Sequence, residues 1–141
     1  MDSKGALLTA AQFNWNVRVY YEDTDTAGVV YYANYLRFFE RARTEWLRHL
    51  GLNQEKLAAE EGLRFVVRRA TLDFVAAARL DDLLQISVRI LKLAKASLEL
   101  EQEASNQGRR ICAATVQVAF LRNADFRPVP IPVSIRAKMQ P

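Results

Sequence analysis

The fold is decided by residues 23–35, which read DTDTAGVVYYANY. Apolar residues alternate with polar ones before this stretch, from Phe13 to Tyr20, and this period of two predicts a strand with one buried face. After the stretch, apolar residues recur at helical spacing from Asn34 to Leu50, which predicts a long helix. The loop between them holds two carboxylates, a glycine and two adjacent tyrosines, so it is the main candidate for chemistry.

The predicted long helix is apolar over much of its girth, so we expect it to pack into a concave sheet rather than lie on a surface. On its polar side, the i,i+3 spacing of Glu40 with Arg43 and of Glu45 with Arg48 predicts two ion pairs. Residues 53–61 predict a short second helix.

The remainder of the chain is rich in predicted strands. Residues 63–78 alternate with a phase shift near residues 68–69, which predicts a strand with a bulge. Three further alternating segments predict strands at hairpin spacing: 84–90, 97–104 and 112–120. One long helix facing a largely antiparallel sheet is an α+β arrangement.

Length and composition indicate one ordinary globular domain over residues 1–141. Residues 1–12 are small and polar and predict a flexible lead-in. The chain begins without an apolar run, which argues against a signal peptide. No run of about 18 apolar residues predicts a membrane span. We therefore expect a cytoplasmic protein.

Charge and reactive side chains narrow the function classes. The net charge of +4 suits an anionic ligand, but the positive residues are dispersed, so nucleic acid is not an expected partner. Cys112 is the only cysteine and lies on the apolar phase of a predicted strand, which predicts a core residue and no internal disulfide. His49 is the only histidine and lies near the predicted helix end, so we expect neither a zinc cluster nor a Ser-His-Asp triad.

Residues 21–35 together with residues 39–43, FERAR, resemble the 4-hydroxybenzoyl-CoA thioesterase family of hotdog-fold enzymes. Within that family they are most similar to the acyl-CoA thioesterase branch associated with the bacterial Tol-Pal system, and the similarity continues through residues 81–84 and 127–132. The resemblance implies a curved antiparallel sheet wrapped around one long central helix. It also implies a homodimer or homotetramer with sheets joined edge to edge, and active sites at the dimer interface.

The resemblance places the catalytic carboxylate of a thioester hydrolase on Asp25. This carboxylate acts as a nucleophile or as a general base on the thioester of an acyl-CoA or an acyl carrier protein, giving the free acid. The oxyanion donor falls on the backbone N–H of Tyr32 at the helix N-terminus, where the most similar branch usually carries histidine. No metal and no further cofactor are implied, because CoA is part of the substrate.

Further residues of the loop are candidates for supporting roles. Asp23 is expected to make turn and capping hydrogen bonds, with support of the catalytic group as the alternative. Gly28 is a candidate for substrate contact, through close approach or a positive φ. Tyr31 and Asn34 are also candidates for substrate contact, and Asn34 is alternatively the N-cap of the helix.

Basic and hydroxyl groups elsewhere are candidates for holding CoA. Lys95 lies where relatives carry basic residues, and Ser97 is close to it in the chain, so these two are the expected partners of the CoA phosphates, with Arg122 and Arg127 as looser candidates. Solvated strand and turn positions are the alternative for all four.

Two other function classes remain open from the sequence. One is a non-catalytic module that binds acyl-CoA or an acyl carrier protein. The other is an interaction protein for envelope machinery, located at the inner face of the cell membrane, which rests only on the Tol-Pal-like branch. Leu63 and Phe65 either line an acyl pocket or pack in the core.

Overall fold

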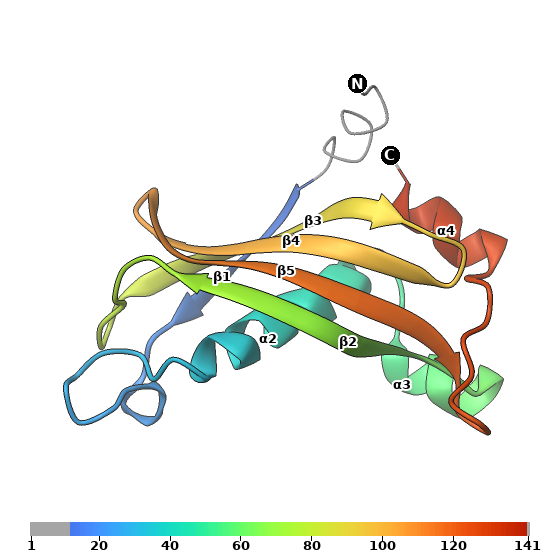
Figure 1. Cartoon of the computed structure of the whole chain (residues 1–141), viewed down its shortest axis with the longest axis horizontal. Coiled ribbons are helices and arrows are strands. Elements are labelled where there is room, and N and C mark those ends of the chain that lie inside the picture. Colours follow the sequence, from blue (N-terminus) through green and yellow to red (C-terminus); the bar gives the residue numbers. More distant parts are fainter. Residues whose placement is uncertain (1–11, 141) are drawn as a thin grey trace.

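The computed structural model describes residues 12–140 and shows a curved antiparallel sheet that arches over a long helix (Figure 1). Apart from residue 12, the predicted lead-in lies outside the described residues. The elements are, in chain order, β1 (Gln12–Arg18), η1 (Tyr21–Asp23), α2 (Asn34–His49), α3 (Gln54–Lys56), η2 (Leu57–Glu61), β2 (Leu63–Phe74), β3 (Leu83–Leu93), β4 (Ser97–Asn106), β5 (Arg109–Arg122) and α4 (Val133–Met139).

The sheet has the strand order β1-β3-β4-β5-β2, and all neighbouring strands are antiparallel. β1 and β2 are consecutive strands of the chain but form the two opposite edges. The segment that joins them must therefore cross a face of the sheet, and α2 makes this crossing beneath the concave face (Figure 1). The expected α+β hotdog arrangement is confirmed.

The buried stripe of α2 explains its position. Phe38, Phe39 and Ala42 are fully buried against the sheet. Gly51 follows the helix with a φ of 84°, a left-handed conformation that ends the helix and suits glycine. The prediction of a helix packed into a concave sheet is therefore confirmed.

One predicted ion pair on α2 forms and the other does not. Arg48 Nη1 lies 2.7 Å from Glu45 Oε2, as expected. Arg43 instead turns inward and donates a 3.0 Å hydrogen bond from Nη1 to Oε1 of Gln102 on β4. The polar-side prediction for Arg43 is wrong because the sheet offers a buried amide acceptor that the spacing within the helix does not reveal.

Two bulges lie in the same band of the sheet. The register of β2 on β5 shifts between Val67 and Arg69, as predicted, and that of β3 on β4 shifts between Ile90 and Lys92. Both shifts lie at the level where Glu99 of β4 pairs with Gln117 of β5. Bulges bend a strand and increase its twist, so their alignment curves the sheet around α2 at one level.

Three predicted segments differ from the structure. Trp15 is 39% exposed because its strand is an edge, so Val17 is the one buried residue of β1 and Phe13 is half-buried. β2 ends at Phe74 rather than at residue 78, since Val75 and Ala76 both donate to the same Ile111 carbonyl and leave the ladder. The short second helix predicted for residues 53–61 is a single α-helical turn, α3, that continues as a π-helical turn, η2.

Candidate active site

Asp23 fixes both ends of the loop that precedes α2. Its side chain is 5% exposed, and its Oδ2 accepts a 2.8 Å hydrogen bond from the backbone N–H of Tyr20. Its Oδ1 accepts a 2.7 Å bond from Nδ2 of Asn34, and its carbonyl accepts from the N–H of Tyr31. The expected structural role of Asp23 matches these contacts.

Asp25 lies at the exposed tip of this loop. Its Oδ1 accepts a 2.9 Å hydrogen bond from the N–H of Ala27, and its backbone pairs with Val29 and Gly28 in a tight turn. Its Oδ2 has no hydrogen-bond partner within residues 12–140. One oxygen therefore orients the carboxylate while the other remains available to a reactant.

Gly28 allows this turn to close. Its φ is 79°, in the left-handed region that a side chain disfavours. A Cβ at this position would meet no atom within 4 Å. The positive φ, rather than close packing against the protein, is therefore what requires glycine here, and contact with substrate remains a prediction.

A candidate oxyanion donor lies just before the N-terminus of α2. In the part of the chain that the structure describes, the backbone N–H of Tyr32 donates to no other residue. Ala33 takes the N-cap position, and no side chain caps the helix. The N-cap prediction for Asn34 is wrong because its amide is committed to the carboxylate of Asp23. Its contact with substrate remains a prediction, although the side chain is only 6% exposed.

An aromatic cluster borders these groups. The rings of Tyr31 and Tyr32 are 4.9 Å apart, and Tyr32 meets Phe74 of β2 edge-on at 6.0 Å. Tyr31, Tyr32 and Phe74 are 49%, 62% and 52% exposed. The neighbouring Tyr32 hydroxyl raises the pKa of the Tyr31 phenol above its ordinary value. The cluster is an open apolar surface with phenol hydroxyls, and it includes the residue that carries the free N–H.

A second segment holds the loop against the sheet. The N–H of Val30 donates a 2.8 Å bond to the carbonyl of Ala78, and Val29 pairs with Arg79. Ala78 in turn donates to the buried hydroxyl of Tyr35 on α2, at 3.4 Å. The loop is therefore bound to α2 through Asp23 and to the β2–β3 connection through Ala78.

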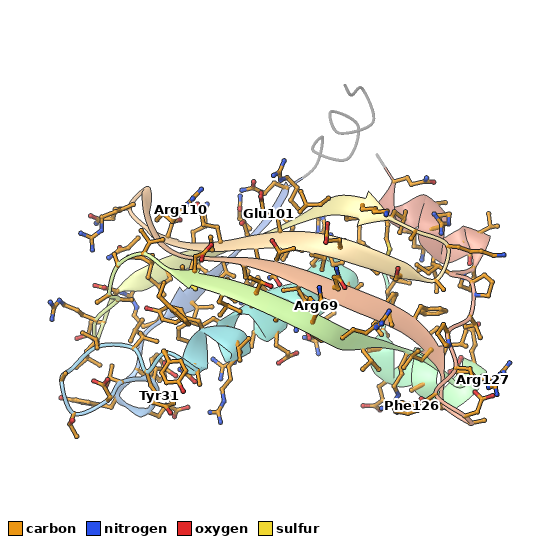
Figure 2. All side chains as sticks on the ribbon, in the orientation of Figure 1. Tyr31, Arg69, Glu101, Arg110, Phe126 and Arg127 are labelled. Atoms are coloured by element: carbon orange, nitrogen blue, oxygen red, sulfur yellow. The ribbon has the colours of Figure 1, made fainter. Side chains whose placement is uncertain are left out.

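The candidate CoA-binding residues lie far from Asp25 within one chain. Ser97 pairs with Ala119 of β5, whereas Phe74, beside Tyr32, pairs with Cys112. Seven residues of β5 separate these two pairings, about 23 Å at ~3.3 Å per residue. Figure 2 likewise shows Tyr31 at one end of the molecule and Arg127 at the other. A single chain therefore does not bring Lys95 and Ser97 to Asp25.

Other candidates have different surroundings. Arg122 makes a two-pronged contact with Asp125, which lowers the pKa of that carboxyl, and Arg127 lies 3.9 Å from the same carboxylate. The single charge of Asp125 is thus shared by two arginines, and the group of three keeps a net charge of +1. Cys112 is fully buried, as predicted, and burial raises the pKa of its thiol to about 12. His49 packs against Phe13 at the end of α2.

Residues 12–140 contain no group of three or more His, Cys, Asp or Glu side chains suited to a metal ion. Over the same range no helix is long and apolar enough to cross a membrane.

Comparison with known proteins gives consistent matches. Residues 19–139 match the thioesterase-like superfamily. The chain is 44% identical over 125 residues to the acyl-CoA thioesterase YbgC of Haemophilus influenzae, covering 89% of this chain and 92% of that protein. A crystal structure of a probable thioesterase from Bartonella henselae has a TM-score of 0.82 and 40% identity, covering 86% and 100% of the two chains. A 4-hydroxybenzoyl-CoA thioesterase variant complexed with 4-hydroxybenzoyl-CoA shares the fold, with a TM-score of 0.87 at 21% identity over 93% of this chain and all of that one.

Proposed function

The chain belongs to the thioesterase-like superfamily, and from this premise we propose that it hydrolyses the thioester of an acyl-CoA to a free acid and CoA. The observation that carries the proposal is the pairing, on one loop, of a free carboxylate oxygen of Asp25 with a free backbone N–H at Tyr32. Thioester hydrolysis needs both: an oxygen to attack or to activate water, and a donor for the oxyanion.

The reaction follows from these two groups. With Asp25 as general base, the carboxylate takes a proton from water, and the oxygen of that water attacks the thioester carbonyl. The carbonyl oxygen becomes an oxyanion that accepts a hydrogen bond from the N–H of Tyr32, where the positive end of the α2 dipole also favours it. The C–S bond then breaks, and CoA leaves as a thiolate that takes up a proton.

With Asp25 as nucleophile, the same free oxygen attacks the carbonyl and forms a mixed anhydride, which water then hydrolyses. The oxyanion donor is the same in both routes. The tyrosine side chain at position 32 does not affect a backbone donor, so the proposal does not depend on the histidine that the resemblance led us to expect there.

We assign a dimer formed through the free edge of β2. This strand has twelve residues, and within residues 12–140 it pairs only with β5, which leaves one row of its backbone groups unpaired in that range. Exposed apolar side chains at this edge are Val67 and Phe74 of β2, Val75 directly after it, and Tyr32, which meets Phe74. A two-fold axis through an edge strand pairs the strand with its own copy, antiparallel, and covers these side chains.

The dimer also accounts for the distant CoA candidates. Antiparallel pairing over the full length of β2 brings the Phe74 end of one strand beside the Leu63 end of the other. That second end carries Ser97 and Lys95, at the turn between β3 and β4. We therefore propose that Asp25 and Tyr32 of one protomer act on a thioester whose CoA phosphates are held by Lys95 and Ser97 of the partner subunit, while Tyr31 and Gly28 border the substrate.

The acyl-carrier-protein thioester as a second substrate, a tetramer of such dimers, the cytoplasmic location and the Tol-Pal association remain predictions. The decisive experiment measures thiol release from short-, medium- and long-chain and aromatic acyl-CoAs. Saturable turnover with at least one substrate supports the proposal. Tight binding without turnover on the whole panel would instead support the non-catalytic binding module.

A further inference from the structure

A cavity of about 260 Å³ lies between the C-terminal half of α2 and the concave face of the sheet. Its walls are mainly apolar and come from α2, β2, β4 and β5: Trp46, Leu47, Phe65, Val67, Leu98, Leu100 and Val118. An apolar cavity of about 150 Å³ holds benzene, so this one is large enough for a six- to eight-carbon chain. Phe65 therefore lines the cavity and also packs against the core, with its ring 4.8 Å from that of Phe120.

Three polar side chains interrupt the apolar lining: Glu40, Arg43 and Gln54. Arg43 donates one hydrogen bond, to Gln102, whose own amide donates to the carbonyl of Phe39. Within residues 12–140, no carboxylate lies within 4 Å of the Arg43 guanidinium, and every fully buried side-chain N or O atom has a partner. The remaining N–H groups of Arg43 consequently border open space.

These donors are poorly solvated. Burial lowers the pKa of Arg43, and Glu40 nearby partly offsets this effect. A guanidinium remains charged in proteins even so, and a partly desolvated charged donor is stabilised strongly by an acceptor. Glu40 also receives a hydrogen bond from Thr44, so its carboxylate is held in place beside the cavity. A hydroxyl group fits this pair, because it accepts from Arg43 and donates to Glu40.

We propose that this cavity receives the acyl group of the substrate, and that Arg43 binds a hydroxyl oxygen toward the far end of an aliphatic acyl chain. The inference rests on the proposed thioesterase function and names its substrate class: medium-length acyl-CoAs hydroxylated away from the thioester.

The mouth of the cavity lies at the β2 edge, where Val67 is 42% exposed. Within one chain, seven residues of β2 separate Val67 from Phe74 beside the catalytic loop, about 23 Å at ~3.3 Å per residue. An eight-carbon chain does not span this distance. The antiparallel dimer shortens it, because Phe74 of one β2 then lies opposite Leu63 of the other, only two residues, about 7 Å, from Phe65 in the cavity wall. The acyl group of a thioester held at Asp25 of one protomer thus enters the cavity of its partner.

The test compares kcat/KM for matched six- and eight-carbon acyl-CoAs with and without a terminal hydroxyl, in wild type and in Arg43→Met. Wild type is expected to prefer the hydroxylated member by about tenfold, the value of one hydrogen bond to a charged group. Arg43→Met should abolish that preference and leave the unsubstituted chains at or above their wild-type rates. Arg48→Met is the matched control, because Arg48 is ion-paired with Glu45 at the surface of the same helix.

Three outcomes overturn the inference: a wild-type preference for the unsubstituted chain, a preference for a terminal carboxylate over the hydroxyl, or a preference that persists in Arg43→Met. If Arg43→Met fails to fold, Leu98→Phe tests the cavity instead, because Leu98 lines it from β4, away from the β2 edge. This change in the cavity wall should lower kcat/KM for the eight-carbon chain about tenfold relative to acetyl-CoA, and an equal loss for both would overturn the assignment. Absence of wild-type turnover on every acyl-CoA would overturn the thioesterase proposal itself, and the inference with it.

Discussion

Asn34 donates a 2.7 Å hydrogen bond from Nδ2 to Oδ1 of Asp23, and both side chains are buried. The bond joins the first residue of α2 to a residue two positions before Asp25. The loop that carries the carboxylate is therefore fixed to the helix whose N-terminus supplies the oxyanion donor. Loop and helix can hold the reacting groups in one geometry because this buried contact sets their distance.

Asn34→Asp should replace this bond with two carboxylates in a buried site. The repulsion raises the pKa of one of them in the folded state, so the folded state binds a proton that the unfolded state releases. Stability of the variant should then rise as pH falls, with a loss of at least about 2 kcal/mol at pH 8 and a smaller loss at pH 5. Urea unfolding at both pH values measures this. Asn16→Asp on the exposed edge strand is the control, and equal losses at the two pH values would contradict the prediction.

Asp25→Asn should leave the fold intact, because the Ala27 N–H can still donate to the amide oxygen that replaces Oδ1. Turnover should fall at least about a hundredfold, the usual cost of losing a general base or nucleophile. Steady-state thiol release and thermal unfolding measure the two effects. Glu22→Gln, an exposed carboxylate near the same loop, should retain wild-type turnover. Retention of most activity by Asp25→Asn would exclude the catalytic role of Asp25.

A site shared between protomers should show complementation. Asp25→Asn protomers and Lys95→Ala/Ser97→Ala protomers each lack one half of the proposed site. When the two are refolded together in equal amounts, half of the dimers are mixed, and each mixed dimer holds one complete site. About a quarter of wild-type activity should then return.

The control for complementation is the same two proteins refolded separately and assayed together at once. If the co-refolded mixture is no more active than the separately refolded proteins assayed together, then each site lies within one chain, or Lys95 and Ser97 do not contribute to it.

The Cys112 thiol should make stability fall at alkaline pH. Burial raises its folded-state pKa to about 12, whereas the thiol of the unfolded chain ionises near pH 8.5. Above that pH the unfolded state binds fewer protons than the folded state, so the free energy of unfolding decreases as pH rises toward 12. Unfolding curves between pH 8 and 10.5 should show a shallower decrease for Cys112→Ala, and identical slopes would refute the assignment.

The periodicity of apolar residues predicted most of the fold, because burial of one face of a helix or strand leaves a repeating pattern within that element. The spacing of Phe38, Phe39 and Ala42 predicted the helix, and the phase shift near Arg68 predicted the bulge. Exposure at Trp15 was not predictable in this way, since an alternating strand does not reveal whether it forms an edge. The inward turn of Arg43 depends on Gln102, which is 59 residues away in the chain.

The site was predictable in composition but not in arrangement. Resemblance identified Asp25 and Tyr32, and the structure gives each a free group on one loop. Asn34 was misassigned because a polar residue at a helix start usually serves as the cap, whereas here a buried carboxylate competes for its amide. The separation of Asp25 from Ser97 follows from how the strands pair. It could not be predicted from the sequence, because the pattern of one strand does not reveal its register on a neighbouring strand.

The bulge in β2 makes the strand tolerant of the loss of one residue. Side chains alternate between the faces of a strand, so removal of one residue from a regular strand turns every later side chain over. Arg68 is the extra residue of β2: Val67 pairs with Val118 and Arg69 with Gln117, so its deletion would join two stretches that are already in register. A single-codon deletion there would therefore leave Phe74 facing Tyr32 and Tyr35, and would remove only the local bend of the sheet.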